Sequence, residues 1–358
     1  MKDSLFSIMT YCITIIMNRN LVIIIVVIVA IGAVGGIAAT LFNKPAQTTM
    51  DIGYLPAASY GLLWIAQEKG YFTEQGLQVT LKEYSNVASL VIALKAGEID
   101  GAAVTSVALA AFVRDLDISI VGGNSLDGTA LAAYNASGVV DLDDLSGRTL
   151  ATVLYVPGDF VFKKAMAQTE LNVTLSTFFT PADALAALEN GNVTAALLWE
   201  PYASLAEFRN ISLPIWDKDV YPDDYPCCLQ AFSKSYLTAN PTVATKFIKA
   251  LVKAEVLAYQ QTEQAIPMVK KYLEDIPTAI IYNSIFYIDP ALGRARNPLS
   301  AYFNTTELQQ FFTLLVQSQL LTQNDYANLL TKMDSSYYDK ALSELRAENF
   351  ALPAIYSR

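Results

Sequence analysis

The amino-acid sequence predicts an α/β protein built from two doubly wound α/β lobes, with a hinge and a cleft between them. Three observations predict this class. Apolar strands and helices alternate from residue 50, the same plan returns on a smaller scale after residue 141, and the chain is nearly all helical after Pro241. One transmembrane helix is expected before the first lobe, and a helical C-terminal extension after the second.

The N-terminal segment predicts a membrane anchor. Residues 21–42 form an uncharged run of 22 residues. At about 1.5 Å rise per residue, this run is long enough to cross a hydrocarbon core of about 30 Å. Lys2 and Arg19 before the run, against Lys44 after it, favour a cytoplasmic N-terminus. The body of the protein is therefore expected on the extracytoplasmic side of the cell membrane, held by a single pass.

The predicted division of the chain follows from these patterns. Its parts are a cytoplasmic N-terminus (1–20), an anchor (21–42), a tether (43–49), a first lobe (50–134), a second lobe (135–228), and a return to the first lobe with C-terminal helices (229–358). A cleaved signal peptide is the alternative to an uncleaved anchor, and Met17 is an alternative start.

The first lobe is predicted from four strands that alternate with three helices. Gly70 and Gly97 end the first two helices, and polar pairs precede the second and third. The expected elements, in order, are strand 50–54, helix 61–69, strand 77–84, helix 87–96, strand 101–104, helix 107–114 and strand 118–122. Such a βαβ series predicts a mainly parallel sheet.

The second lobe repeats this plan with fewer elements. The expected elements are strand 148–153, helix 160–168, helix 181–190 and strand 193–199. A strand over 229–234 is expected to return to the first lobe, with crossings between the lobes near 125–140 and 228–236. Helices follow over 241–259, 262–272, 305–317 and 324–330.

Composition excludes several classes of function. The sequence contains no histidine, which excludes histidine zinc sites, Ser-His-Asp triads and histidine acid–base catalysis. Residues 43–358 hold 22 basic and 33 acidic residues, a net charge of −11 that disfavours nucleic acid as a partner. The three cysteines, Cys12, Cys227 and Cys228, are too few for a disulfide scaffold or a four-cysteine zinc site. Free buried thiols are expected for the adjacent pair. We predict a monomer without cofactor or metal.

Candidate ligand-binding residues lie where strands end and helices begin, because open α/β sheets bind ligands outside the carboxyl ends of their strands. These residues are Ser59, Tyr60, Ser85, Asn86, Thr105, Ser106, Asn124, Tyr155, Asp159, Trp199 and Glu200. The serine, threonine and asparagine side chains stand where free N–H groups and helix dipoles bind anions. The alternative is that each is only a helix cap. The aromatic residues are candidates for a pocket wall. Asp159 or Glu200 would favour an amine- or pyrimidine-bearing solute if either faced it.

Several segments resemble a known family of transport proteins. The most specific is Pro181-Ala-Asp-Ala-Leu-Ala-Ala-Leu188, followed by Gly191-Asn-Val193 and Trp199-Glu-Pro-Tyr202. Ala66-Gln-Glu-Lys-Gly70-Tyr-Phe72 and Leu145-Ser-Gly-Arg-Thr-Leu-Ala151 accompany it in order. Together they resemble the solute-binding proteins of ABC importers in the nitrate/sulfonate/bicarbonate and thiamine-precursor group, over roughly residues 50–260. Thr194 departs from the pattern, which usually carries aspartate there.

The resemblance implies a type II periplasmic-binding-protein fold and a non-enzymatic protein. It also implies that the chain captures a small solute outside the cytoplasm and delivers it to an ABC permease and its ATPase. It assigns Glu200 to a Trp-Glu-Pro signature with a role in structure or at the hinge. A small oxyanion is the expected solute, with a thiamine-precursor pyrimidine or another heteroaromatic solute as the alternative. A pyrimidine-synthesis-like enzyme of the same fold is disfavoured, because that branch depends on histidine.

Overall fold

The computed structural model describes residues 47–169, 171–290 and 293–357. The predicted cytoplasmic N-terminus and anchor, and residues 43–46 of the predicted tether, lie outside the described residues. Among the residues that are described, no helix is long and apolar enough to cross a membrane. Residues 47–358 form one unit by their internal contacts, and it contains both sheets.

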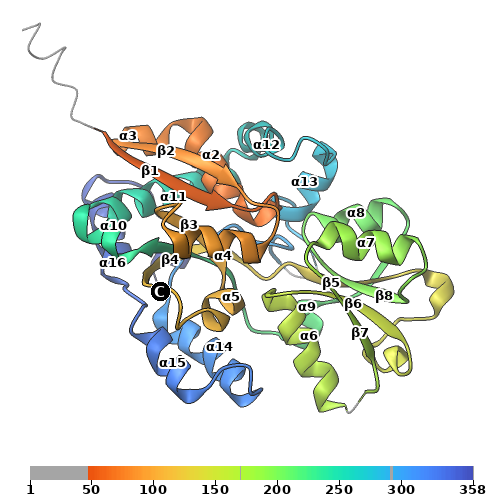
Figure 1. Ribbon diagram of the computed structural model, residues 1–358. Helices are drawn as coiled ribbons and strands as arrows, with labels where there is room; N and C mark the ends of the chain where they lie inside the picture. Colours follow the sequence, from red (N-terminus) through yellow and green to blue (C-terminus); the bar gives the residue numbers. More distant parts are fainter. Residues whose placement is uncertain (1–46, 170, 291–292, 358) are drawn as a thin grey trace, which may run out of the picture. The chain divides into compact units, whose positions relative to one another are not determined.

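The first sheet has five strands and carries the first lobe (Figure 1). In spatial order they are β2 (Leu77–Glu83), β1 (Thr48–Tyr54), β3 (Gly101–Thr105), β10 (Pro226–Ser233) and β4 (Ile118–Leu126). β1 is parallel to β2 and β3, whereas β10 is antiparallel to both of its neighbours. The mainly parallel sheet that the sequence predicts is therefore present, with one returning strand inserted into it. β10 begins at Pro226, three residues earlier than expected, so both cysteines belong to the strand.

The second sheet also has five strands and carries the second lobe. In spatial order they are β7 (Thr174–Phe178), β6 (Thr149–Val153), β8 (Ala195–Trp199), β5 (Thr129–Ala133) and β9 (Ser212–Trp216). β6 is parallel to β7 and β8, and β5 is antiparallel to β8 and β9. The strands β5, β7 and β9 are not among the elements expected from the sequence.

Helices surround both sheets. Those of the first half of the chain are η1 (Ala58–Tyr60), α2 (Gly61–Lys69), α3 (Tyr71–Glu74), α4 (Val87–Ala96), α5 (Ser106–Ala111), η2 (Asn135–Ser137), η3 (Leu142–Leu145), α6 (Pro157–Gln168), α7 (Pro181–Glu189), α8 (Tyr202–Phe208) and α9 (Asp217–Val220). The remainder are α10 (Lys234–Ala239), α11 (Val243–Gln260), α12 (Thr262–Lys270), α13 (Thr278–Ile285), α14 (Thr305–Gln317), α15 (Gln323–Leu330), α16 (Ser336–Ala347) and η4 (Ala354–Ser357).

An aromatic cluster fixes α11 to the first sheet. The Phe247 ring of α11 lies 5.0 Å from the Phe72 ring and 5.1 Å from the Phe232 ring of β10, measured between ring centroids. A side chain at Gly101 would meet the Phe232 ring at 2.7 Å, so only glycine fits this position of β3. Buried aromatic rings contribute about 0.5–1.5 kcal/mol per pair beyond their area. The cluster therefore holds the central strands of the first lobe in place.

The chain passes between the sheets twice. β4 ends at Leu126 and β5 begins at Thr129, so the first crossing is Asp127-Gly128. The second runs from α9 to the start of β10, over residues 217–225. The sequence predicts lobe boundaries at 134/135 and 228/229 and a return crossing at 228–236. The return crossing lies earlier because residues 226–233 pair as a strand in the first sheet.

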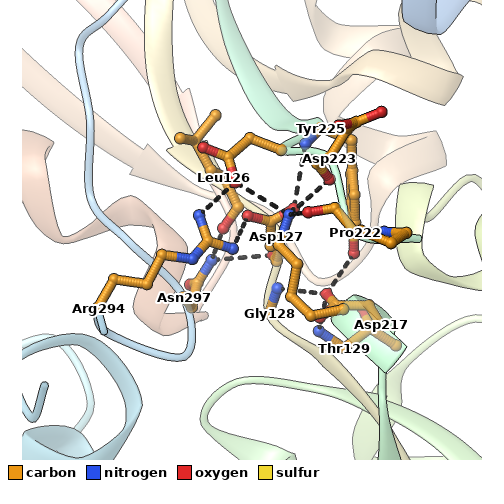
Figure 2. Close-up of polar contacts among 12 residues, drawn as sticks. Leu126, Asp127, Gly128, Thr129, Asp217, Pro222, Asp223, Tyr225, Arg294 and Asn297 are labelled. Atoms are coloured by element: carbon orange, nitrogen blue, oxygen red, sulfur yellow. Dashed lines mark hydrogen bonds and ion pairs between the residues drawn. The ribbon is translucent and has the colours of Figure 1, made fainter. Parts of the chain in front are cut away.

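Buried carboxylates tie the two crossings together (Figure 2). Asp217 Oδ2 accepts hydrogen bonds from the backbone N–H groups of Gly128 and Thr129, at 2.7 and 2.9 Å, and from the Tyr225 hydroxyl at 2.6 Å. Asp127 accepts a hydrogen bond from the backbone N–H of Tyr225 at 3.1 Å and pairs with Arg294. Burial, and then the charge of Asp217, raise the pKa of Asp127 to about 7. We call these residues (Asp127, Asp217, Tyr225 and Arg294) the hinge network.

Candidate functional site

Two adjoining cavities lie between the lobes at the carboxyl ends of the strands. One has a volume of about 130 Å³ and the other about 20 Å³. The first is lined by Leu55, Pro56, Ala57, Ser85, Asn86, Val87, Phe179, Thr180, Pro181, Ala182, Trp199 and Tyr202. The second shares four of these residues and adds Ser59, Tyr60, Thr105, Val156, Cys227 and Cys228. We call them together the interlobe cavity.

Larger hollows exist elsewhere among the described residues. One of about 390 Å³ is lined by residues of the second crossing and by the start of α14, including Asp223, Asp224 and Glu307. The starts of α4 and α7 do not line it, it shares only Cys228 with the interlobe cavity, and the charged side chains in its lining are all acidic. The interlobe cavity is therefore the better candidate for the solute, although it is smaller.

The start of α4 contributes the first-lobe side of the cavity. Asn86 is the N-cap, and its side chain accepts a hydrogen bond from the Ser89 N–H at 2.9 Å. Ser85 precedes it and is exposed. The predicted cap role of Asn86 is thus present, and its position on the cavity wall is compatible with the predicted anion role as well.

The start of α7 contributes the opposite side, from the second lobe. Thr180 is the N-cap, accepting a hydrogen bond from the Asp183 N–H at 3.1 Å, and Pro181 occupies the first helical position. The first N–H groups of a helix have no partner within it, and the dipole at this end is positive. The cavity therefore has a helix N-terminus on each lobe.

Aromatic side chains form much of the remaining wall. Trp199, at the end of β8, lines both cavities, and Tyr202 and Phe179 line the larger one. Tyr60 lines the smaller one, and its buried hydroxyl has no hydrogen-bond partner. Burial raises the pKa of Tyr60 well above its usual value, so the hydroxyl keeps its proton as a donor.

The hydroxyls of Thr105 and Ser106 are engaged with backbone carbonyls. Thr105, the N-cap of α5, lines the cavity, and its hydroxyl donates to the carbonyl of Tyr155 across the lobes at 2.6 Å. The Ser106 hydroxyl is buried and donates to the carbonyl of Pro226 at 2.6 Å. Tyr155 contacts Phe112 of the first lobe, with ring centroids 5.0 Å apart, but does not line the cavity. These three residues hold the lobes and the returning strand together.

Asn124 and Ser59 are linked beneath the cavity. The Asn124 side chain donates to the carbonyl of Ser59 at 2.6 Å and accepts from the Gln230 amide at 2.8 Å. Asn124 is fully buried and is not part of the cavity wall, whereas Ser59 is part of it. Asn124 therefore fixes the backbone of η1, which in turn carries Tyr60.

The two predicted carboxylates do not line the interlobe cavity. Asp159 is buried at the start of α6 and pairs with Lys163 at 2.6 Å, while burial raises its pKa. Glu200 accepts hydrogen bonds from the Ser204 hydroxyl at 2.8 Å and the Ser284 hydroxyl at 2.9 Å, and burial raises its pKa too. Its position joins α8 of the second lobe to α13.

The lining of the interlobe cavity contains no aspartate, glutamate, lysine or arginine. Within the described ranges, no group of three or more cysteine or carboxylate side chains is placed to hold a metal ion. What the cavity offers is helix N-termini, a Tyr60 hydroxyl, two thiols and aromatic faces. Such a set binds a small polar or anionic group beside an apolar or aromatic one.

Some lining residues were not among the sequence candidates. Phe179, Thr180, Pro181 and Ala182 follow β7, an edge strand with a partly exposed, polar sequence that gives no strong strand signal. The rule that ligands bind at the carboxyl ends of strands selects them once β7 is known. Cys227 and Cys228 precede the strand expected over 229–234, so the sequence did not predict their position in β10 or on the cavity wall.

Comparison with known proteins agrees with this architecture. The "Putative binding protein YtlA" of Bacillus subtilis (strain 168) is 27% identical over 300 residues, covering 81% of this chain and 87% of the relative. The periplasmic nitrate-binding protein NrtA from Synechocystis PCC 6803 aligns with a TM-score of 0.71 at 16% identity, covering 86% of this chain and 92% of NrtA. The periplasmic aliphatic sulphonate-binding protein SsuA from Escherichia coli aligns with a TM-score of 0.63 at 19% identity, over 80% and 92% of the two chains.

These likenesses confirm two predictions and identify the family. The fold is that of the type II periplasmic binding proteins, and the three relatives named above are described as binding proteins. The model of the NMT1-like family matches residues 43–270, which is more than half of the sequence. This chain is a member of the NMT1-like family.

Proposed function

We propose that the chain is the solute-binding component of an ABC importer and that it captures a small oxyanion, such as nitrate, a sulfonate or a bicarbonate-like ion, in the interlobe cavity. The solute passes to a permease that works with an ATPase. Residues 21–42 hold the protein at the cell membrane, and the described body lies on the extracytoplasmic side. The relatives named for nitrate and sulphonate support the solute class by analogy.

One observation carries the proposal. The helices α4 and α7 start on opposite lobes, and both starts line the same cavity. Each N-terminus favours a negative charge by about 0.3–1 kcal/mol when exposed, and by more when water is excluded. An anion between them gains from both only while the lobes are together. Binding therefore favours the state in which the lobes are in contact.

The carboxylates favour an oxyanion over an amine or pyrimidine solute. Asp159 is paired with Lys163, and Glu200 is hydrogen-bonded within the protein. Neither presents a free negative charge to the cavity, and an amine would find no counter-ion among the lining residues. The aromatic wall would suit the thiamine-precursor alternative, but no carboxylate in the lining would pair with its amine.

A charge placed at the start of α7 tests the solute class. Ala182 is exposed, lines the cavity and is the second residue of α7, where an acidic side chain suits the helix dipole. Ala182→Asp should therefore keep the melting temperature while it repels an anion. Thr306→Asp is the matched control, because Thr306 is the exposed second residue of α14 and lines no described cavity.

The full chain and both variants would be screened by thermal shift and calorimetry with nitrate, bicarbonate, taurine, alkanesulfonates and pyrimidine amines. We expect stabilisation by one of the anions, and an affinity about tenfold or more lower in Ala182→Asp alone. Binding of only amines or neutral heterocycles, or an anion affinity that Ala182→Asp leaves unchanged, would refute the oxyanion assignment.

The anchor is tested separately. We expect the native protein to sediment with membranes, to resist extraction by alkaline carbonate, and to retain residues 21–42 when the mature N-terminus is sequenced. A mature N-terminus after residue 42 would refute the anchor and leave the solute proposal standing.

A further inference from the structure

The start of β10 places two thiols on the wall of the interlobe cavity. Cys227 and Cys228 are both buried free cysteines, and their sulfur atoms lie 3.6 Å apart. Both line the cavity beside Tyr60 and Trp199. In a regular strand, neighbouring side chains point to opposite faces, so adjacent residues do not share a wall.

A β-bulge explains this arrangement. In the pairing with β4, Pro226 lies opposite Leu126 while Cys228 lies opposite Ser125, so Cys227 is an extra residue in the strand. The register shifts again between Cys228 and Leu229. Bulges often occur next to functional sites, where they redirect a side chain. Here the bulge brings both thiols to the same cavity and to each other.

The surroundings of the pair make its two thiols unequal. The Cys227 thiol, and after it the hydroxyls of Ser125 and Tyr60, lower the pKa of Cys228 against the effect of burial. Cys228, together with burial, raises the pKa of Cys227. The Tyr60 and Ser125 hydroxyls are buried and have no hydrogen-bond partner of their own. They are therefore available to stabilise a thiolate at Cys228, the form that attacks disulfides.

We propose that Cys227 and Cys228 are a thiol–disulfide exchange site in the wall of the interlobe cavity, which takes small disulfides that enter between the lobes. The Cys228 thiolate attacks one sulfur of the small disulfide, and the first small thiol leaves. Cys227 then loses its proton and attacks the Cys228 sulfur, releasing the second small thiol. Two protein thiols are oxidised to one Cys227–Cys228 disulfide, and the small disulfide is reduced to two thiols.

The test uses the full chain in detergent with Cys12→Ser, which removes the only other cysteine of the sequence. The probe is 4,4′-dithiodipyridine, which releases one ultraviolet-absorbing 4-thiopyridone at each exchange. We expect two thiopyridones for each chain, no retained pyridyl adduct, and an intact mass lower by two hydrogen atoms. Peptide mass spectrometry should then find the Cys227–Cys228 disulfide within one peptide.

Single-thiol variants are the matched controls. Cys227→Ser should release one thiopyridone and keep the adduct. Cys228→Ser should react about tenfold more slowly, because the remaining Cys227 thiol is buried and has only the Ser125 hydroxyl to stabilise its thiolate, whereas Cys228 has the hydroxyls of Ser125, Tyr60 and Ser59. Circular dichroism before and after reaction shows whether each variant is folded, and Cys227→Ala replaces Cys227→Ser if that variant does not fold. Stable pyridyl adducts on the two-cysteine protein, reaction only in denaturant, or faster reaction of Cys228→Ser than of Cys227→Ser would overturn the proposal.

Discussion

The contact between Thr105 and Tyr155 predicts how strongly the two lobes hold together without solute. The Thr105 hydroxyl is the donor in a 2.6 Å hydrogen bond to a carbonyl of the other lobe. Thr105→Val keeps the shape of the side chain and removes this bond. The partner carbonyl belongs to a half-buried residue, so water can reach it once the lobes separate.

The expected size of the effect follows from the bond. A neutral hydrogen bond contributes about 0.5–1.5 kcal/mol net, so its loss shifts the balance between touching and separated lobes about fivefold toward separation. Thr105 also accepts a hydrogen bond from the Ala108 N–H at 3.3 Å as the cap of α5, and valine loses this bond too. Two controls separate the effects. Thr105→Ser keeps both bonds. Thr180→Val removes a helix cap on the cavity wall, and within the described residues the Thr180 side chain is hydrogen-bonded only to Asp183 of its own helix.

Small-angle scattering of the solute-free protein is the assay. We expect a larger radius of gyration for Thr105→Val than for the wild type, Thr105→Ser or Thr180→Val. Calorimetry with the stabilising anion should show about fivefold weaker binding in Thr105→Val, because solute must then also bring the lobes together. Equal scattering curves and affinities for Thr105→Val and the wild type would refute the role of this bond. An equal change in Thr180→Val would assign the effect to helix capping instead.

Two further predictions concern buried carboxylates. Tyr225→Phe removes the 2.6 Å hydrogen bond to Asp217, and the free energy of unfolding in urea should fall by about 2 kcal/mol. Tyr221→Phe is the control and should change it little. Equal losses of stability in the two variants would contradict the hinge network. Burial raises the pKa of Glu255 to about 7 from 4.5, so its contribution to stability is present below pH 4.5 and is lost as the pH rises to 7. Glu255→Gln lacks this titration. The difference in the free energy of unfolding between the variant and the wild type should therefore shift in favour of the variant by up to about 3 kcal/mol as the pH rises from 4.5 to 7.5. An unfolding free-energy difference that does not vary with pH would contradict this.

The strands of the first sheet were predictable because each carries a local signal. Met50–Tyr54 and Leu77–Glu83 are apolar or alternating segments next to glycine or proline, and their helices have capping residues in the expected places. β5 has no such signal. Its sequence, Thr-Ala-Leu-Ala-Ala, favours a helix by intrinsic propensity, and it becomes a strand because β8 and β9 pair with it on both sides. Contacts that are distant in the sequence decided this element.

The same limit applies to the candidate site. Asn86 could be predicted as a helix cap near the cavity, because its partner Ser89 is three residues away. The hydroxyls of Thr105 and Ser106 could not be assigned from sequence, because their acceptors lie 50 and 120 residues away. Glu200 belongs to the same class, since one of its donors is Ser284. A polar residue at a helix start is therefore a good predictor of a helix cap. It is a poor predictor of whether the side chain is free to bind a ligand.

The start of β10 connects the hinge network, the returning strand and the interlobe cavity within four consecutive residues. Tyr225 donates to Asp217 at the hinge, and the carbonyl of Pro226 accepts from Ser106 at the start of α5. Cys227 and Cys228 then enter the cavity wall. Because these residues are covalently consecutive and buried, the wall cannot shift without moving the backbone that the hinge carboxylate holds.

A change at the two thiols is therefore expected to alter lobe movement as well as the cavity. The scattering measurement on Thr105→Val can be repeated after oxidation of the cysteine pair. Both the substitution and the oxidation should change the radius of gyration, because both act on the equilibrium between touching and separated lobes. If oxidation left the scattering curve of every variant unchanged, the thiols would be part of the wall alone and not of the hinge.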